Sequence, residues 1–247
     1  MYVERTYRSQ IGNPDLAFFQ VTAKETDLFI GIDRKSFNPG LPRQVEELVW
    51  RLRWELEEYI KIDPEFRTTL EPHWLLPAAP PIARRMGEAA WQAGVGPMAA
   101  VAGAFAEAVG RWLMSRAEEV LVENGGDIFL RLKRPRLVGI QAGQSPFSGR
   151  LALEIKPPQT PLGVCTSSGT VGPSYSAGKA DAAMVMAASA ALADAAATAV
   201  GNAVQGVEDI EKGLAVGRRI GGVAGVLVIK DDRLGVWGQM KLVPVKA

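Results

Sequence analysis

A short tetrapeptide carries side-chain oxygens on both sides of two adjacent glycines: Asn124, Gly125, Gly126 and Asp127. Glycine adopts positive φ angles at little cost and lets the backbone approach a ligand closely. This segment could therefore hold a nucleotide or a ribose. The same residues also suit an ordinary β-turn, which is the more frequent use of such a sequence.

A carboxylate and a hydroxyl lie four residues apart in the segment 193–198, at Asp194 and Thr198. On a helix this spacing places both side chains on one face. In an alanine-rich helix the pair suits a hard cation such as Mg²⁺, which keeps several waters and bridges substrate phosphates. The structural alternative is that Asp194 stabilises the start of a helix, where carboxylates are common. The residues alone leave both interpretations open.

Hydroxyl groups and a glycine follow a predicted strand at Ser168, Gly169 and Thr170. Loops in this position often carry binding groups, so the three residues could receive a phosphate or a carbonyl. A solvated serine-rich connection is the more common case. No P-loop with Gly-Lys-Ser or Gly-Lys-Thr occurs, and no dinucleotide-binding fingerprint follows a strand.

His73 is the only histidine and Cys165 the only cysteine. Histidine-pair zinc sites and disulfide frameworks are therefore excluded, and a catalytic triad would need His73 as its base. His73 lies in a proline-rich segment, where a structural role is the more usual one. The apolar neighbours of Cys165 predict a buried and inert thiol.

Strands and helices must position these residues, and their patterns are read from hydrophobic periodicity and turn residues. Strands are predicted at 16–22, 27–33, 120–123, 128–132, 136–141, 151–156, 162–166, 182–187, 225–229 and 234–239. Helices are predicted at 43–60, 83–92, 98–110, 190–204 and 208–219. The alanine and glycine residues of 98–110 should let that helix approach its neighbours closely. The strands are expected to add to one sheet in chain order.

The composition predicts a single domain over residues 1–247, with two packed lobes and a boundary near 63–95 as the alternative. Hydrophobic residues make up 47% of the chain, and 28 Lys plus Arg balance 27 Asp plus Glu. This balance gives no field that attracts nucleic acid or an anionic membrane, so a small-molecule partner is expected. Without a signal-peptide pattern or a bilayer-spanning apolar stretch, we expect a cytoplasmic protein.

Two segments together resemble the motifs of ApbE-type proteins, in the same order and at a similar separation. Glu123 to Asp127 resembles Asn-Ala-Gly-Gly-Asp, and the segment 193–198 resembles Ala-Asp-Ala-x-Ala-Thr. The chain looks most like a cytosolic branch of that superfamily, historically linked by name to thiamine biosynthesis, and the likeness runs from about residue 94 to the C-terminus. It implies an α+β, T-fold-like architecture of mixed helices and antiparallel sheet.

The resemblance also implies a chemistry, because ApbE-type flavin transferases bind FAD and Mg²⁺ and attach FMN to a threonine of a target protein. Carried over to this sequence, Asp194 and Thr198 are metal ligands. The nucleotide pocket would include Asn124, Gly125, Gly126 and Asp127.

Two departures from the family pattern keep a second hypothesis open. The segment 94–103 lacks the lysine of the family's Gly-x-Ala-Lys-Gly motif. The segment 174–179 lacks the histidine that the family has before its second motif. The alternative is a non-catalytic protein that binds a flavin, pterin or other nucleotide-like ligand. Such a protein could form a homodimer. A third alternative is a structural protein whose motifs serve only turns and helix packing.

Overall fold

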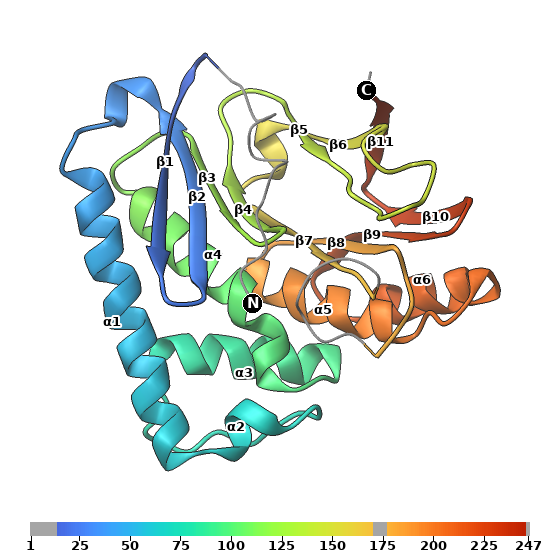
Figure 1. Ribbon diagram of the computed structural model, residues 1–247, viewed down its shortest axis with the longest axis horizontal. Helices are drawn as coiled ribbons and strands as arrows, with labels where there is room; N and C mark the ends of the chain where they lie inside the picture. Colours follow the sequence, from blue (N-terminus) through green and yellow to red (C-terminus); the bar gives the residue numbers. More distant parts are fainter. Residues whose placement is uncertain (1–13, 170–176, 246–247) are drawn as a thin grey trace.

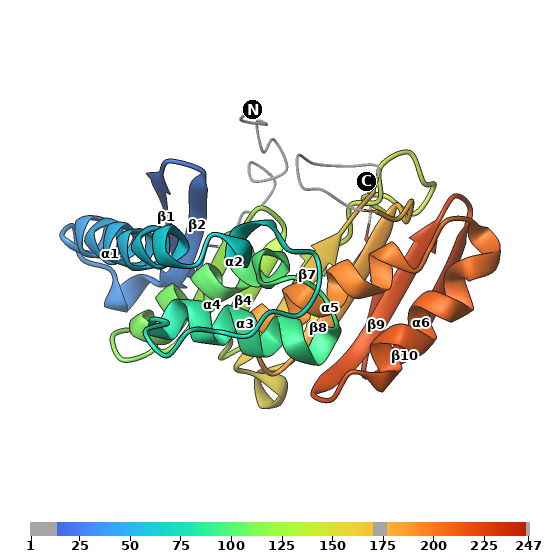
Figure 2. The same ribbon diagram turned by 90° about the horizontal axis from the view of Figure 1, so that it is seen from below.

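Helices cover one face of a large antiparallel sheet, and a smaller sheet lies against the other face (Figure 1). The computed structural model describes residues 14–169 and 177–245. Figure 2 shows the helices gathered on one side of the large sheet. This is the α+β architecture that the sequence predicted.

The large sheet contains eight strands among the described residues. These are β1 (Leu16–Ala23), β2 (Thr26–Asp33), β3 (Val120–Asn124), β4 (Asp127–Arg131), β7 (Leu162–Ser167), β8 (Ala182–Ala187), β9 (Val223–Lys230) and β10 (Arg233–Gly238). They follow one another across the sheet in this order, and each pairs antiparallel with the next. All eight were predicted from the sequence, because each is a short apolar run between turn residues.

A second sheet has three strands, two from the segment between β4 and β7 and one from near the C-terminus. It consists of β5 (Arg136–Gly139), β6 (Leu151–Ile155) and β11 (Lys241–Pro244), in the order β11-β6-β5. The expectation that strands add to one sheet in chain order is therefore wrong for β5 and β6. Pro135 precedes β5 and cannot donate to a ladder, so the chain leaves the large sheet there.

The large sheet has a separate core on each face, as the alternating residues of β7 show. Cys165 belongs to the core beneath the helices, whereas Leu162 and Val164 belong to the core between the two sheets. Neighbouring residues of a strand point to opposite faces, so both faces of β7 are buried.

Six helices are found among the described residues. They are α1 (Leu41–Ile62), α2 (Glu65–Thr68), α3 (Pro81–Ala93), α4 (Val101–Leu113), α5 (Ala190–Asn202) and α6 (Ile210–Arg219). α1, α4, α5 and α6 contact the large sheet, while α3 packs against α4 and α5 (Figure 2). The amphipathic helix predicted at 43–60 is α1, whose buried residues include Val45, Val49 and Leu56.

Small residues bring α4 close to its neighbours, as the alanine and glycine run predicted. A Cβ atom on Gly103 would lie 2.2 Å from the carbonyl oxygen of Ala190 on α5. A Cβ atom on Gly110 would lie 2.1 Å from Cδ1 of Phe129 on β4. Neither approach leaves room for a side chain, so α4 is held tightly between α5 and the sheet.

The proline-rich segment after α1 is fixed by a buried polar cluster. The hydroxyl of Tyr59 donates to Asp63 Oδ2 at 2.7 Å and accepts from the amide of Leu76 at 3.0 Å. His73 Nε2 lies 2.9 Å from Asp63 Oδ1. These contacts give His73 a structural role in tying the segment to α1. The lobe boundary near 63–95 stays a prediction.

Within the described residues, no single helix is both long and apolar enough to cross a membrane. The helix pair Pro81–Ala93 and Pro97–Leu113, bent by 104°, passes that test when the two are taken together.

Candidate functional site

The predicted Asn-Gly-Gly-Asp turn forms the tip of the hairpin between β3 and β4. Asn124 pairs with Asp127, so Gly125 and Gly126 are the two turn residues, with φ angles of 71° and 106°. Both angles are in the region that favours glycine. The side chain of Glu123 accepts the amide N–H of Gly126 at 3.0 Å. A Cβ atom on Gly126 would meet no atom within 4 Å, so a ligand can approach the tip.

The two sequence motifs meet at the first turn of α4. Asn124 Nδ2 donates to the carbonyl oxygen of Ala102 at 3.1 Å. Asp194 Oδ2 accepts the amide N–H of Gly103 at 2.8 Å. Asp194 lies within α5, so it stabilises the start of a helix other than its own. This contact gives Asp194 a structural role at the start of α4, and its role as a metal ligand stays a prediction.

Two carboxylates come together beneath the hairpin tip. Burial raises the pKa of Asp194 well above its ordinary value, and the nearby charge of Asp127 raises it further. The amide groups of Gly103 and Ala102 act in the opposite direction but do not compensate. Two neighbouring acidic groups repel each other when both are ionised, so the site favours a proton or a cation that offsets this repulsion.

Glu107 shows what a buried carboxylate does when cations are beside it. It lies on α4 and accepts from Ser189 Oγ at 2.7 Å and from the amide of Ala190 at 2.8 Å, at the start of α5. Arg111 Nε donates to its other oxygen at 2.7 Å. Burial acts to raise the pKa of Glu107, but the bonds from Ser189 and Arg111 outweigh it and hold that pKa below its ordinary value.

Each helix therefore receives a carboxylate at its start from the other helix: Asp194 of α5 serves α4, and Glu107 of α4 serves α5. Helix starts present unpaired N–H groups and a partial positive charge, which carboxylates satisfy. Glu107 accepts from Ser189 and Arg111, whereas Asp194 faces the charge of Asp127, so the two pKa values shift in opposite directions.

Cys165 lies in the same buried region on β7. Its thiol donates to the carbonyl oxygen of Ala190 at 3.3 Å. Burial raises the pKa of Cys165, and the charges of Asp127 and Asp194 raise it further. Nucleophilic chemistry requires the thiolate, so the site keeps this thiol inert, as the sequence predicted.

Thr198 is partly exposed on α5, one turn beyond Asp194. A Cβ atom on Gly201 would lie 3.5 Å from Ser167 Oγ, which places the end of β7 beside the last turn of α5. Seven residues of helix separate Asp194 from Gly201, a distance of about 10 Å along the axis. The site thus extends along α5 from the hairpin tip towards the loop after β7.

The loop after β7 begins with Ser168, which is partly buried, and Gly169, which is exposed. The amide of Gly169 donates to the carbonyl oxygen of Ala180 at 2.9 Å, so the two ends of the loop are joined. Thr170, the third residue predicted here, lies outside the described residues. Ser168 and Gly169 therefore lie near the C-terminal end of α5, not beside Asp194.

The donor atoms of the site fit Mg²⁺. Among the described residues, His, Cys, Asp and Glu side chains do not gather in groups of three or more as a metal site. Mg²⁺ needs no such group, because one or two carboxylates plus waters and substrate phosphates hold it. Asp194, Asp127 and the hydroxyl of Thr198 are hard oxygen donors, and a cation would offset the repulsion between the carboxylates.

Sequence reasoning did not identify Gly103 or Glu107 as parts of this region. The signal for Gly103 was its place in a run of small residues, which predicted close helix packing but no partner. Glu107 is the acidic residue of that otherwise apolar run, which could have marked it as a buried, paired group.

Comparison with known families and proteins gives consistent results. A family model described as AbpE bacteria matches residues 9–219. A UPF0280 protein of Methanocella arvoryzae is 47% identical over 195 residues, which cover 78% of this chain and 79% of the relative. A UPF0280 protein of Methanocaldococcus jannaschii is 40% identical over 226 residues, or 90% of each chain.

Solved structures share the fold at low sequence identity. The flavin transferase ApbE from Vibrio cholerae superposes with a TM-score of 0.59 and 15% identity, covering 90% of this chain and 96% of that one. The flavinyl transferase ApbE of Pseudomonas stutzeri, in its apo form, gives 0.59 and 13%, with 90% and 94% covered. The chain belongs to the AbpE bacteria family, with UPF0280 proteins as relatives and the fold of the ApbE flavin transferases.

Proposed function

We propose that this protein is a magnesium-dependent enzyme that transfers the FMN part of FAD, or a related nucleotide phosphate, to a protein acceptor. The observation that carries the proposal is that the glycine turn and Asp194 meet at the first turn of α4, through the bonds of Asn124 to Ala102 and of Asp194 to Gly103. Family membership and the shared fold support the same class of reaction. FAD is here the substrate, and Mg²⁺ the resident metal.

The chain's own residues would divide the work along α5. Asp194 and Thr198 would hold the metal, which supplies positive charge against the phosphate oxygens when bound. The open turn at Gly125 and Gly126 would let the backbone approach the nucleotide.

The loop after β7 would receive the outer part of the ligand. Ser168 and Thr170 would provide hydroxyl groups suited to a phosphate or a carbonyl, and Gly169 would let the backbone come close to the ligand. Asp194 and this loop are about 10 Å apart along the axis of α5, as calculated from the helical rise per residue. This distance is long enough for a pyrophosphate and a sugar.

Thermal stability of metal-stripped protein tests the proposal, because a ligand that binds only the native state raises the melting temperature. The four conditions are no addition, FAD, Mg²⁺, and FAD with Mg²⁺. We expect the largest rise with both present, and its loss in Asp194→Asn. Asparagine can still accept the N–H of Gly103, so this variant removes the charge and keeps the contact with α4.

Asp232→Ala is the matched control, because Asp232 is exposed in the turn between β9 and β10. It should respond to FAD and Mg²⁺ as the wild type does. Absence of any FAD- and Mg²⁺-dependent rise in the wild type would refute the proposal. A rise that persists in Asp194→Asn would remove Asp194 from the metal site.

A second candidate is a non-catalytic protein that binds a flavin, pterin or other nucleotide-like ligand. It is favoured by the bond between Asp194 and Gly103, which gives this carboxylate a structural role without a metal. The missing lysine of 94–103 points the same way. This candidate predicts a rise in stability with FAD that does not depend on Mg²⁺, and no covalent flavin on any acceptor protein.

A further inference from the structure

A shallow groove lies between α1 and the segment that leads into α3. Its volume is about 330 Å³, and it is open to solvent. The lining combines aromatic and apolar surfaces with two carboxylates: Trp54, Glu55, Glu58, Tyr59, Ile62 and the small residues Ala78 and Pro80. None of these residues belongs to the Asp127 and Asp194 site.

The apolar side chains of the groove are more exposed than core packing requires. Trp54 is 64% exposed and Ile62 is 59% exposed, although the opposite face of α1 is buried in the core. Trp50 on α1 and Leu76 on the segment that leads into α3 are also exposed. Single exposed apolar residues are common, but two large ones that line the same groove, as Trp54 and Ile62 do, are typical of an interaction site.

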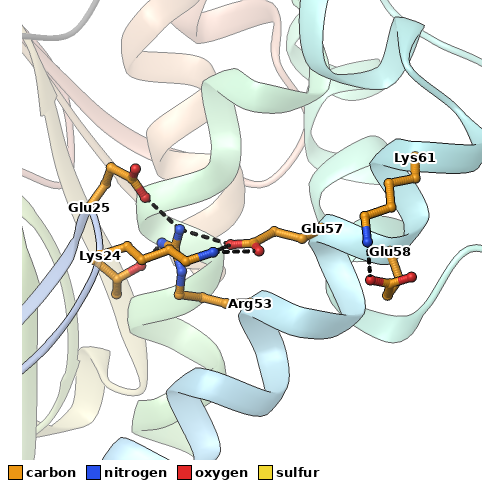
Figure 3. Close-up of polar contacts among 7 residues, drawn as sticks. Lys24, Glu25, Arg53, Glu57, Glu58 and Lys61 are labelled. Carbon is orange, nitrogen blue, oxygen red and sulfur yellow. Dashed lines mark hydrogen bonds and ion pairs between the residues drawn. The ribbon is translucent and has the colours of Figure 1, made fainter.

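The carboxylates of α1 are not all used in the same way (Figure 3). Glu57 binds Lys24 and Arg53, which ties α1 to the first hairpin. Glu58 pairs with the neighbouring Lys61, at 2.5 Å, and the Lys61 side chain is 69% exposed. Glu55 makes no ion pair within residues 14–169 and 177–245. An exposed pair contributes little, so an incoming cation can replace Lys61.

A cation is the chemical group that this lining recognises. The ring of Trp54 attracts an ammonium or guanidinium group, and carboxylates bind the same groups through charged hydrogen bonds. The hydroxyl of Tyr59 is already engaged with Asp63 and Leu76, so Tyr59 offers the groove only its ring.

We propose that this groove binds an arginine or lysine side chain, with an adjacent apolar residue, of a partner protein. A small ligand needs an enclosed pocket, whereas a shallow groove with an apolar surround suits a protein surface. The carboxylates disfavour an anionic membrane, which attracts basic residues. The inference rests on the proposed function, because transfer to a protein needs the acceptor to be held, and this groove holds it outside the reaction site.

Fluorescence anisotropy with labelled twelve-residue peptides tests the inference on the full chain. One peptide contains leucine, glycine and two arginines; in the other two peptides, glutamate or norleucine replaces both arginines. The arginine peptide should bind at least tenfold more tightly than either other peptide. Trp54→Ala and the double variant Glu55→Gln, Glu58→Gln should each weaken it at least tenfold, while Glu47→Gln on the same helix should not.

Three results would overturn the inference. The first two are equal affinity for the three peptides and unchanged binding in the groove variants. Sedimentation gives a third, namely a dimer that Trp54→Ala dissociates without any peptide binding, which would assign the groove to a second copy of the chain. FAD and Mg²⁺ should stabilise Trp54→Ala as they do the wild type. If FAD and Mg²⁺ do not stabilise the wild type either, the proposed function is refuted, while the peptide-binding result is unaffected.

Discussion

Replacing Glu107 with glutamine tests the role of the carboxylate between α4 and α5. Its side chain is 3% exposed and accepts from Ser189 and Ala190 on one oxygen and from Arg111 on the other. Glutamine keeps one acceptor but turns an amide donor towards Arg111. Because hydrogen bonds to charged groups contribute about 1.5–3 kcal/mol, we expect unfolding free energy to fall by about 2–3 kcal/mol.

Alanine at position 107 should cost more, about 3–5 kcal/mol, because it leaves buried groups without any partner. The pH dependence gives a second test. The pKa of Glu107 is below its ordinary value of 4.5, so its stabilisation is present above pH 4.5 and is lost as pH falls through the folded-state pKa. The glutamine variant should lack this loss, so its deficit relative to wild type should shrink in acid.

Urea unfolding at pH 7 and at several values below 4.5 measures both effects. Glu47→Gln is the control, since Glu47 forms an exposed i,i+4 pair with Arg43. Such pairs contribute about 0.3–0.5 kcal/mol. If Glu107→Gln costs no more than this control at pH 7, or keeps its full deficit in acid, the carboxylate does not stabilise the start of α5 as described.

Two further predictions concern the same helix pair. Gly103→Ala should destabilise the protein by about 1–3 kcal/mol through overpacking, because its Cβ would lie 2.2 Å from the Ala190 oxygen. Gly139→Ala is the control, since a Cβ there would meet nothing within 4 Å. Equal urea midpoints for the two variants would refute the close contact. In metal-free protein, burial and Asp127 raise the pKa of Asp194, so wild type should lose stability as pH rises above the ordinary value of 3.8, and Asp194→Asn should not. If the melting temperatures of wild type and Asp194→Asn change in the same way from pH 4 to 8 in the presence of a chelator, the raised pKa of Asp194 is contradicted.

Local patterns were enough to predict the hairpins and the glycine turn. Gly125 and Gly126 between two β-prone runs specify a two-residue turn, and the structure has it. β11 was missed because Lys241–Pro244 is only four residues long and ends in a proline. The second sheet was missed because periodicity identifies strands without identifying their partners.

The convergence of the two motifs could be expected only through the family resemblance. Gly103 and Asp194 are 91 positions apart, and no local pattern relates them. The contact depends on how α4 and α5 pack, which tertiary structure decides. For the same reason the sequence showed the small residues of α4 but not which helix approaches them.

The exchange of carboxylates between α4 and α5 has a dynamic consequence. Gly103 of α4 and Ala190 of α5 each donate an amide N–H to a carboxylate of the other helix, so the two helix starts should open as one cooperative unit in hydrogen exchange. The amides of Gly103 and Ala190 would then report the same opening free energy, although they belong to segments far apart in the chain. A ligand that engages Asp194 would change protection at the start of α4, and through Glu107 this change would reach the start of α5.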